Sequence, residues 1–189
     1  MLPQHLAAAP HELLTPRLSL ELPCPGHAPA FAESLGLSLH DPRFIVWRRS
    51  ADLAWALHFC DDDARSVAAG EDLVFHVFQR SDRAYVGRVD VHSVDFSACR
   101  GEIGYAGDVR RAGRGLMREA ALAVMELAFR IGFERIEAMS DARNARALHF
   151  AGSLGMQREG LLRRHERDGQ GDLCDMVLFA RLRGDAAPA

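Results

Sequence analysis

Arg110, Gly113 and Gly115 belong to the segment Arg-Arg-Ala-Gly-Arg-Gly-Leu-Met, between a strand-like run and a long amphipathic pattern that begins at Leu116. Two glycines separated by one residue let the backbone turn tightly and leave its N–H groups uncovered. A helix starting at Leu116 directs its unpaired N–H groups and the positive end of its dipole to the same place. Such a place suits an anion, most naturally a phosphate, and arginines raise the positive potential further. The alternative is a glycine-rich turn with solvated arginines.

The loop does not match the common nucleotide motifs. A Walker loop requires Gly-Lys-Ser/Thr, and no Lys or Ser/Thr follows Gly115. A dinucleotide fingerprint requires a third glycine three residues beyond Gly115, where the sequence has Arg118. The loop therefore predicts a phosphate site outside these two classes.

The loop and its neighbours resemble a known family. Arg110-x-x-Gly113-x-Gly115 resembles the Arg/Gln-x-x-Gly-x-Gly/Ala pyrophosphate loop of the GNAT superfamily, the acetyl-CoA-dependent N-acetyltransferases. Glu102-Ile103-Gly104-Tyr105 stands where these enzymes carry the strand that lies along the pantetheine arm of the cofactor. Asn144-Ala145-Arg146-Ala147 and Leu154-Gly155-Met156 are similar to the downstream Asn-x-x-(Ala/Ser) and Leu-Gly-Phe pieces.

Three more segments resemble one branch of this superfamily, the Rim-type enzymes that acetylate the N-termini of ribosomal proteins. Leu14-Thr15-Pro16-Arg17-Leu18-Ser19-Leu20 resembles the first strand of that branch. Glu159-Gly160-Leu161-Leu162-Arg163 and Asp175-Met176-Val177-Leu178 resemble its closing Glu-Gly-x-x-Arg and Asp-x-x-x-(Tyr/Phe) pieces. The matches occur in the family's order and run from about residue 14 to residue 182.

The resemblance implies acetyl-CoA as the acetyl-donor cosubstrate. Its pantetheine arm carries two amides, so it can lie against a strand and satisfy open backbone groups there. Residues 105–109 are the expected wall, and in the family this strand also supplies a backbone N–H near the thioester oxygen. Asn144 is expected to bond the arm, although Asn also suits a helix N-cap. The residues expected to hold the donor are Tyr105, Ala106, Gly107, Val109, Arg110, Arg111, Ala112, Gly113, Arg114, Gly115, Leu116, Met117 and Asn144.

Acetyl transfer requires the acceptor amine to lose a proton, and geometry limits the base to a carboxylate or a histidine on the central strands. The resemblance makes Glu102 the first catalytic candidate, because related enzymes carry a glutamate at this position; the alternative is a solvated strand-end carboxylate. Asp90 and His92 are the second candidate pair, since residues two apart share one face of a strand. His76 is expected to be a packed strand residue, and His149 to lie on the surface.

The chain departs from the family pattern where a general acid is expected. Many members carry a tyrosine seven residues after the asparagine, and some a serine three residues after it; here these positions are Ala151 and Ala147. Ser140 or solvent can serve instead, because a thiolate with a pKa of about 8.5 is a tolerable leaving group. A module that binds acyl-CoA without turnover therefore stays an alternative.

The hydrophobic pattern indicates the elements that position these residues. In the first half, a strand over 17–21 and a helix over about 30–39 precede a helical pattern with Ser50 as its N-cap. Asp61-Asp62-Asp63 either interrupts that helix or lies on its solvated face, and attraction of a cationic substrate or metal is the alternative. Trp47 and Trp55 line an acceptor site or pack between helices.

The second half predicts a meander and then strand–helix–strand units. Strands over 73–78, 84–91 and 102–109 form the meander. A core helix follows, because Leu116, Ala120, Val124, Leu127 and Ile131 recur at three- and four-residue spacing, and Gly132 ends it. A strand over 135–140, a helix over 145–154 capped by Gly155, and strands over 156–162 and 173–183 complete the chain. The predicted fold class is α/β (mixed α+β), a single GNAT-like domain whose central mixed, mostly antiparallel sheet is flanked by helices.

Composition agrees with one compact domain over residues 14–183, with an N-terminal extension over 1–13 and a frayed tail over 184–189. The net charge of -3 favours neither a nucleic-acid nor a membrane surface, and no run approaches the roughly 20 apolar residues of a membrane span. Cys24, Cys60, Cys99 and Cys174 are far apart without a Cys-x-x-Cys, so neither a metal site nor a disulfide framework is expected. Reduced thiols in the cytoplasm are the simpler interpretation.

The leading hypothesis is an N-acetyltransferase that moves an acetyl group to a peptide or protein N-terminal amine by direct attack in a ternary complex. A small-molecule amine, such as a polyamine, an amino sugar or an amino-acid derivative, is the alternative acceptor. The third hypothesis is the non-catalytic acyl-CoA-binding module. We expect a monomer or a homodimer.

Overall fold

The computed structural model describes residues 3–38, 44, 52–186 and 188 of the 189-residue chain. Its first half contains α1 (Pro3–Ala7), β1 (Glu12–Leu14), β2 (Leu18–Glu21), the 3-10 turn η1 (Pro25–His27), α2 (Ala28–Ser38), α3 (Leu53–Ala69) and β3 (Leu73–Gln79). The second half contains β4 (Tyr85–Asp95), β5 (Arg100–Gly107), the 3-10 turn η3 (Val109–Arg111), α4 (Leu116–Ile131), β6 (Arg135–Asp141), α5 (Ala145–Ser153), β7 (Gln157–Arg167) and β8 (Leu173–Leu182).

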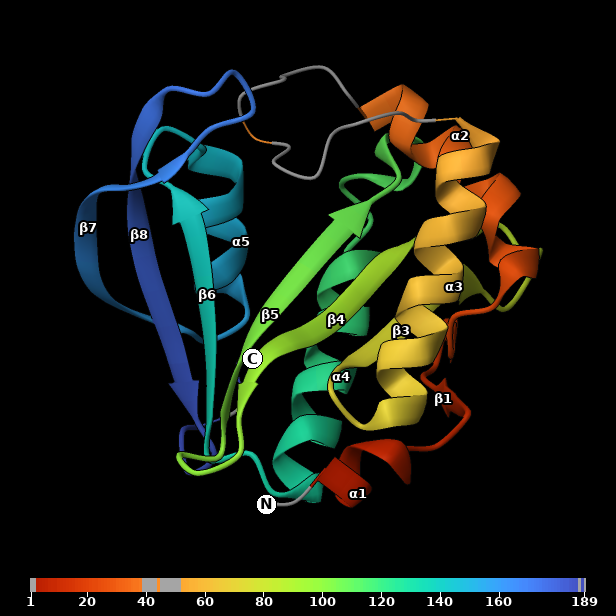
Figure 1. Cartoon of the computed structure of the whole chain (residues 1–189), viewed down its shortest axis with the longest axis horizontal. Helices are drawn as coiled ribbons and strands as arrows, with labels where there is room; N and C mark the ends of the chain where they lie inside the picture. Colours follow the sequence, from red (N-terminus) through yellow and green to blue (C-terminus); the bar gives the residue numbers. More distant parts are fainter. Residues whose placement is uncertain (1–2, 39–43, 45–51, 187, 189) are drawn as a thin grey trace.

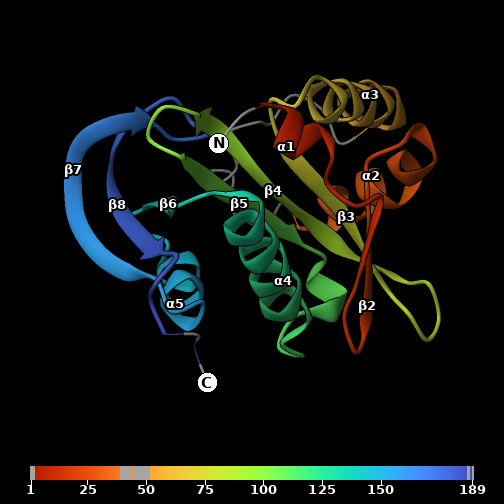
Figure 2. The same ribbon diagram turned by 90° about the horizontal axis from the view of Figure 1, so that it is seen from below.

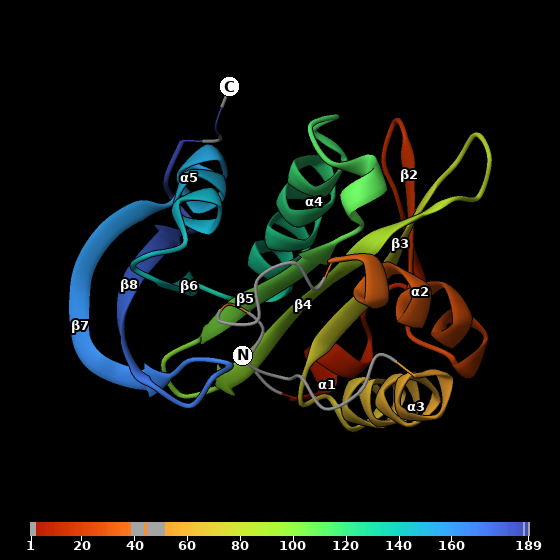
Figure 3. The same ribbon diagram turned by 90° about the horizontal axis from the view of Figure 1, so that it is seen from above.

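The strands form one twisted sheet in the order β1-β2-β3-β4-β5-β6-β8-β7. Every neighbouring pair is antiparallel except β5 and β6, which are parallel. Helices α4 and α5 cover one face of this sheet, and α1 and α3 lie against the other (Figures 2 and 3). The predicted fold class, a mixed and mostly antiparallel sheet flanked by helices, is confirmed.

Strands β5 and β6 pair over a short stretch and then separate. Arg100, Gly101 and Glu102 are opposite residues 135–137, and no later residue of β5 is in register with β6 within the described part of the chain. Beyond that point β5 continues to Gly107 against β4, whereas β6 continues to Asp141 against β8. Figure 1 shows the two strands diverging towards the end of the sheet where the β5–α4 loop lies.

The predicted core helix is α4, and its limits follow from its sequence. Leu116, Ala120, Val124 and Leu127 are buried in the main core, and Ile131 is partly buried against it. Gly132 ends the helix in the left-handed conformation, with φ of 116°. Burial of each large apolar side chain contributes about 1.5–3 kcal/mol, so this stripe fixes the helix under β4 and β5.

Several predicted boundaries were wrong. Helix α3 continues without a break through Asp61-Asp62-Asp63, and its N-cap is Asp52, whose carboxylate accepts a bond from the Trp55 N–H at 2.8 Å. Val109 lies in η3, because β5 already ends at Gly107. Strand β7 extends to Arg167, five residues past the expected end, because it pairs with β8 along that length. Ser50 and Trp47 lie outside the described residues.

The N-terminal residues expected as an extension contribute to the core, since Leu6 is fully buried in it and β1 pairs with β2. Trp55 stacks on Phe59 with ring centroids 4.8 Å apart, and both pack against the smaller core cluster around Phe31. Helix packing thus accounts for Trp55.

His76 forms a buried polar cluster with residues of β4 and α3, as expected for a packed strand residue. Its Nδ1 lies 3.0 Å from the Tyr85 hydroxyl, and its Nε2 lies 3.8 Å from the Cys60 sulfur. The ring of His27 lies 4.9 Å away. Burial lowers the pKa of His76 to about 2, and the charges of His27 and Arg88 lower it further.

Because His76 stays neutral in the folded state while the unfolded chain takes up a proton near pH 6.5, acid favours unfolding. We expect this residue to have no effect on the pH dependence of stability above pH 6.5. Between pH 6.5 and pH 5 it should lower the free energy of unfolding by about 2 kcal/mol. Urea unfolding at pH 7.5 and pH 5 tests this, with His76→Asn retaining a polar side chain in the same place. The variant should lose that part of the pH dependence, whereas His149→Asn, at an exposed position, should keep it; equal pH dependence in wild type and His76→Asn would contradict the assignment.

Candidate active site

The loop between β5 and α4 has the backbone geometry of an anion site. Gly113 and Gly115 have φ of 75° and 71°, the left-handed region that favours glycine. Gly115 is also the N-cap of α4, and it has no side chain to cover the first helical N–H groups. A Cβ atom at Gly113 would meet nothing within 4 Å, so space beside the loop is open. The backbone therefore presents several N–H donors and the positive end of the helix dipole at one place.

The arginines of the loop do not all contribute to its potential. The Arg110 guanidinium donates to Asp108 at 2.6 Å and to Glu33 at 2.6 Å, so two carboxylates neutralise it. Arg111 lies 3.8 Å from the Asp82 carboxylate. Arg114 is exposed, and it makes no ion pair with any residue that the structure describes. The predicted extra positive charge thus comes mainly from Arg114, and backbone donors have to hold the anion.

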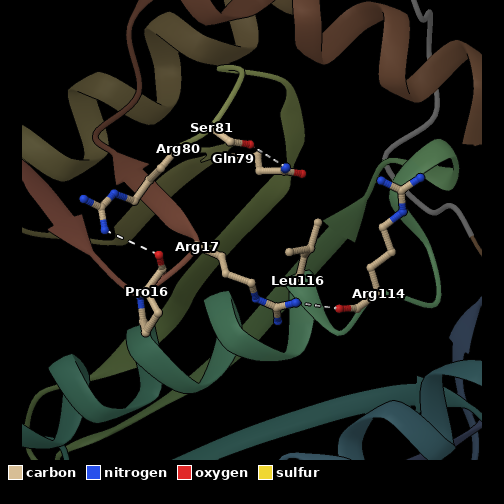
Figure 4. Close-up of a pocket in the computed structure, with 7 residues that line it drawn as sticks. All are labelled: Pro16, Arg17, Gln79, Arg80, Ser81, Arg114 and Leu116. Atoms are coloured by element: carbon tan, nitrogen blue, oxygen red, sulfur yellow. Dashed lines mark hydrogen bonds between the residues drawn. The ribbon is translucent and has the colours of Figure 1, made fainter.

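Arg17 was not expected at this site, and it lies in the turn between β1 and β2. Its guanidinium donates to the Arg114 carbonyl at 2.9 Å and pairs with Glu119 at 2.6 Å. Glu119 also accepts a bond from the Thr15 hydroxyl at 2.6 Å. Figure 4 shows Arg17 reaching the loop across a surface cleft of about 570 Å³, while the Arg114 side chain points away from it. A glutamate in the first turn of a helix is common, so the sequence carried no specific signal for this anchor.

Strand β5 contains Tyr105, Ala106 and Gly107 of the segment that the sequence predicts as the wall of the cofactor site. The Tyr105 hydroxyl is buried and has no hydrogen-bond partner among the described residues. Ser140 nevertheless lies close enough to affect the pKa of Tyr105. Burial raises the pKa of Tyr105 to about 12, while Ser140 lowers it. The Tyr105 ring packs on Phe150 of α5, with centroids 4.5 Å apart. An unused hydroxyl beside the β5 edge that diverges from β6 fits a ligand with polar groups, such as the amides of pantetheine.

Asn144 is the N-cap of α5, as its alternative interpretation predicted. Its side-chain oxygen accepts a bond from the Ala147 N–H at 3.1 Å, and this bond leaves the amide NH₂ to another partner. Ala147 and Ala151 provide no proton donor, and Ala151 is fully buried. Because the usual proton donors are absent, Tyr105 of β5 and Ser140 of β6 are the hydroxyl-bearing residues that remain where these two strands diverge.

The three catalytic candidates lie together on the sheet face opposite α4. His92 and Glu102 are direct partners across β4 and β5, and Asp90 is on the same face of β4. His92 Nδ1 lies 2.6 Å from Asp90 Oδ2. Residues opposite each other in an antiparallel pair have Cβ atoms about 5 Å apart. The structure thus brings the first candidate and the second pair into one group.

The pKa values of these groups are shifted in ways that suit proton transfer. Burial raises the pKa of Glu102, and the carboxylates of Glu166 and Glu137 raise it further, against the opposing effect of His92. The hydrogen bond to Asp90 raises the pKa of His92 despite partial burial. Burial alone would raise the pKa of Asp90, but Arg88 and His92 outweigh it and hold it below the usual value.

Sequence analysis missed Arg88 and placed Asp63 on a solvated face. Asp63 is buried and accepts two bonds from Arg88, both at 2.8 Å. A signal was present, because Asp63 stands at helical spacing with the buried Ala56, Cys60 and Val67. A carboxylate in an apolar stripe requires a buried cation as partner.

Among the described residues, no group of three or more His, Cys, Asp or Glu side chains is arranged to hold a metal ion. Within the same ranges, no helix is long and apolar enough to cross a membrane. Cys24, Cys60, Cys99 and Cys174 form no disulfide with one another.

The architecture and loop have counterparts among known proteins. The chain matches the acetyltransferase (GNAT) domain family over residues 17–157 and belongs to this family. A curated relative named uncharacterized N-acetyltransferase p20, from Bacillus licheniformis, is 29% identical over 114 residues. That alignment covers 60% of this chain and 64% of the relative, so it spans less than two thirds of the relative's length. The predicted family is confirmed, and the matched region is an acetyltransferase domain.

Solved structures share the fold. The microcin C7 self-immunity acetyltransferase MccE, in complex with acetyl-CoA and AMP, has a TM-score of 0.84 at 15% identity, with 94% of this chain and 99% of that chain covered. The ribosomal-protein-S5-alanine acetyltransferase from Vibrio fischeri has a TM-score of 0.79 at 19% identity, with the same coverage of 94% and 99%. At these identities the likeness establishes the architecture.

The Glu119 anchor leads to a stability prediction. Glu119→Ala removes bonds to Thr15 and Arg17 and should lower the free energy of unfolding by about 2 kcal/mol. Glu134→Ala is a matched control, because Glu134 makes one exposed ion pair with Arg183 and should cost less than about 0.5 kcal/mol. Urea unfolding of both variants measures the difference. Equal effects would show that Glu119 does not hold the β1–β2 turn to α4 and its loop.

Proposed function

We propose that this protein transfers the acetyl group of acetyl-CoA to a primary amine, and that the acceptor is the N-terminal amine of a peptide or protein. The observation that carries the proposal is the divergence of β5 from β6 beside the open N-terminus of α4. An extended chain with two amides can lie along the freed β5 edge and place a pyrophosphate on the loop. The domain over residues 14–183 would carry this activity, in the cytoplasm, as a monomer or homodimer.

The residues of the site fit the cofactor. The N–H groups over 113–117 would hold its phosphates, Tyr105 to Gly107 would lie along its pantetheine arm, and Asn144 would bond that arm. The bound cofactor supplies an activated acetyl thioester. The Tyr105 hydroxyl, which keeps its proton at neutral pH, is a candidate proton donor towards the sulfur.

The acceptor is expected on the other face of the sheet. Glu102 and His92 face away from α4, whose core stripe packs under β4 and β5. An amine arrives as an ammonium ion, and the carboxylates of Glu102 and Glu166 give this face negative charge, whereas Glu137 is paired with Arg100 and Arg135. Glu102 accepts a proton from the ammonium ion, and the neutral amine then attacks in the ternary complex. The donor and the acceptor would meet where β5 and β6 diverge, and holding them side by side would accelerate the reaction.

A peptide acceptor is supported by two fold relatives, one named ribosomal-protein-S5-alanine acetyltransferase and one described as modifying the N-terminal serine of 50S ribosomal subunit protein L7/L12. A small-molecule amine is the alternative, since another fold relative is complexed with AMP beside acetyl-CoA. Binding of acyl-CoA without turnover is the third, because Ala147 and Ala151 supply no acid.

The experiment that separates these functions measures CoA release from acetyl-CoA with a panel of peptides, polyamines, amino sugars and amino acids. Saturable release with peptides that is lost when their N-termini are blocked supports the proposal. CoA release with small amines and not with peptides would show that the acceptor is a small-molecule amine. Calorimetric binding of acetyl-CoA without release for any acceptor points to the binding module.

Cofactor binding should depend on the loop backbone. Gly113→Val with Arg114→Glu crowds the turn and reverses its charge, and we expect this folded double variant to lose measurable acetyl-CoA binding by calorimetry. Because backbone donors do most of the holding, Arg114→Ala alone should weaken binding only about tenfold. Unchanged affinity in the double variant would rule out this loop as the cofactor site.

Glu102 should matter for turnover and little for cofactor binding. Glu102→Gln keeps the size and polarity of the side chain but cannot accept the proton. We expect kcat to fall by a factor on the order of 10² to 10³, with acetyl-CoA affinity nearly unchanged. Steady-state kinetics and calorimetry measure the two effects. A fall in kcat of less than about fivefold would remove Glu102 from the role of base.

A further inference from the structure

Asp63 is the inward member of the run Asp61-Asp62-Asp63 on α3. Asp61 and Asp62 are exposed and pair with Arg65 on the same helix. The side chain of Asp63 is only 11% exposed, and both of its oxygens accept bonds from Arg88 of β4. Figure 1 shows α3 lying beside β3 and β4, which brings the two residues together. The run thus contains one residue with a different function.

Arg88 connects two carboxylates. Its side chain is 13% exposed, and it pairs with Asp90 on β4 as well as with Asp63 on α3. It also lies over the ring of Phe59, with 5.1 Å between the guanidinium carbon and the ring centroid. The two acids raise its pKa against the effect of burial, so Arg88 remains charged. A fork of donors held from two sides has little freedom to rotate.

Asp90 connects the fixed Arg88 side chain to His92. One oxygen of Asp90 binds Arg88, and the other lies 2.6 Å from His92 Nδ1. With Asp90 accepting a bond at Nδ1, the proton-accepting position of neutral His92 is Nε2. The side chain of His92 is 40% exposed, whereas that of Asp90 is 7% exposed. The ring therefore has one nitrogen fixed in the protein and an edge that reaches solvent, directly opposite Glu102.

The charges of the four residues balance only when His92 is protonated. Asp63 and Asp90 carry two negative charges and Arg88 one positive charge, so a neutral His92 leaves the group one charge negative. A proton on His92 cancels that charge. The group is thus suited to receive a proton in a partly buried place, where an uncompensated charge is costly.

We propose that Asp63, Arg88, Asp90 and His92 form one hydrogen-bonded line, and that His92 takes up the proton that Glu102 removes from the acceptor amine. Asp63, Arg88 and Asp90 are positioning residues that set the orientation and basicity of His92 from α3. The proposal rests on the proposed function, because it needs an amine acceptor at Glu102.

The step conserves atoms and charge. The acceptor's ammonium N–H bond breaks, and its proton goes to the Glu102 carboxylate, which leaves a neutral amine. The proton then passes from the Glu102 carboxyl to His92 Nε2, giving an imidazolium that Asp90 stabilises. It finally leaves to solvent from the exposed edge of the ring. The direction is favourable, since histidine is more basic than glutamate and Asp90 increases that difference.

The carboxylates that face His92 favour its protonated form. Asp90 acts through the hydrogen bond on β4, Glu102 faces it from β5, and Asp72 acts from the loop that follows α3. Arg88 opposes them, but Asp63 occupies two of its donors. Removing the charge of Asp63 should leave Arg88 bound more fully to Asp90 and should lower the pKa of His92.

The test combines kinetics with NMR titration of the His92 ring, assigned by its absence in His92→Gln. We expect His92→Gln to lower kcat about 10²-fold and to remove its ascending pH limb. Asp63→Asn should move both the NMR titration and that limb by about half a pH unit to lower pH, and Asp90→Asn by about one unit. Asp61→Asn, on the exposed side of the same helix, is the matched control and should move neither. Circular dichroism and melting of each variant verify its fold.

Each outcome decides a part of the proposal. If Asp63→Asn lowers stability without moving the His92 titration, Asp63 is only structural and the line is overturned. If Asp63→Asn does not fold, the Asp90→Asn titration decides the coupling instead. A wild-type enzyme that turns over, with His92→Gln reduced less than about fivefold, overturns the role of His92 and leaves the proposed function intact. Absence of turnover with every amine overturns the proposed function and the proton transfer together, while the titration still decides whether α3 sets the basicity of His92.

Discussion

Three residues of β5 pair with three residues of β6, and the strands then diverge, β5 continuing beside β4 and β6 beside β8. The proposed cofactor site depends on this short pairing, because it leaves the backbone edge of β5 without pairing to β6 beyond Glu102. If β6 had stayed beside β5 to Gly107, the backbone edge beside the α4 loop would be occupied by another strand. A parallel neighbour is needed here because β6 returns after the helix α4, and the antiparallel β8 then pairs with β6 along its whole length. The sheet is thus continuous where β5 and β6 begin, and the backbone edges of the two strands are no longer paired with each other where they end.

The two faces of the diverging strands carry different chemistry. On the side of α4, the loop glycines and the first turn of the helix provide backbone donors, while Arg110 is already neutralised by Asp108 and Glu33. On the opposite side, charged side chains provide the chemistry, with His92 and Glu102 across one register position. Backbone donors are available to any phosphate, whereas in the proposed function the charged face would receive the ammonium form of the acceptor. A site divided in this way suits a reaction between an anionic cofactor and an amine.

Buried charge is concentrated where it can be balanced. Arg88 lies between Asp63 and Asp90, and each of these largely buried carboxylates is paired with the Arg88 guanidinium. Breaking one member of such a group leaves an uncompensated charge, so its geometry is well defined even though its net stabilisation is small. The neutral cluster around His76 lies next to it in the smaller core, and Tyr85 and Cys60 bond that ring without any charge. The first cluster can exchange a proton with solvent through His92, and the second is sealed.

The sequence alone determined the features that depend on neighbouring residues. The left-handed glycines of the loop, the apolar stripe of α4 with its end at Gly132, and Asn144 as an N-cap are set by local sterics and hydrogen bonding, so their residue types reveal them. The order of the motifs also indicated the family and the mostly antiparallel sheet. Only the tertiary structure decided the contacts between distant residues: Asp63 with Arg88, Arg110 with Glu33, and Arg17 with Glu119. These pairings depend on strand register and on which helix face turns inward, and a helical aspartate has the same local propensity on either face. The length of the β5–β6 pairing belongs to the same class, because β5 follows β4 on one side and β6 follows β8 on the other, and these pairings join residues far apart in the chain.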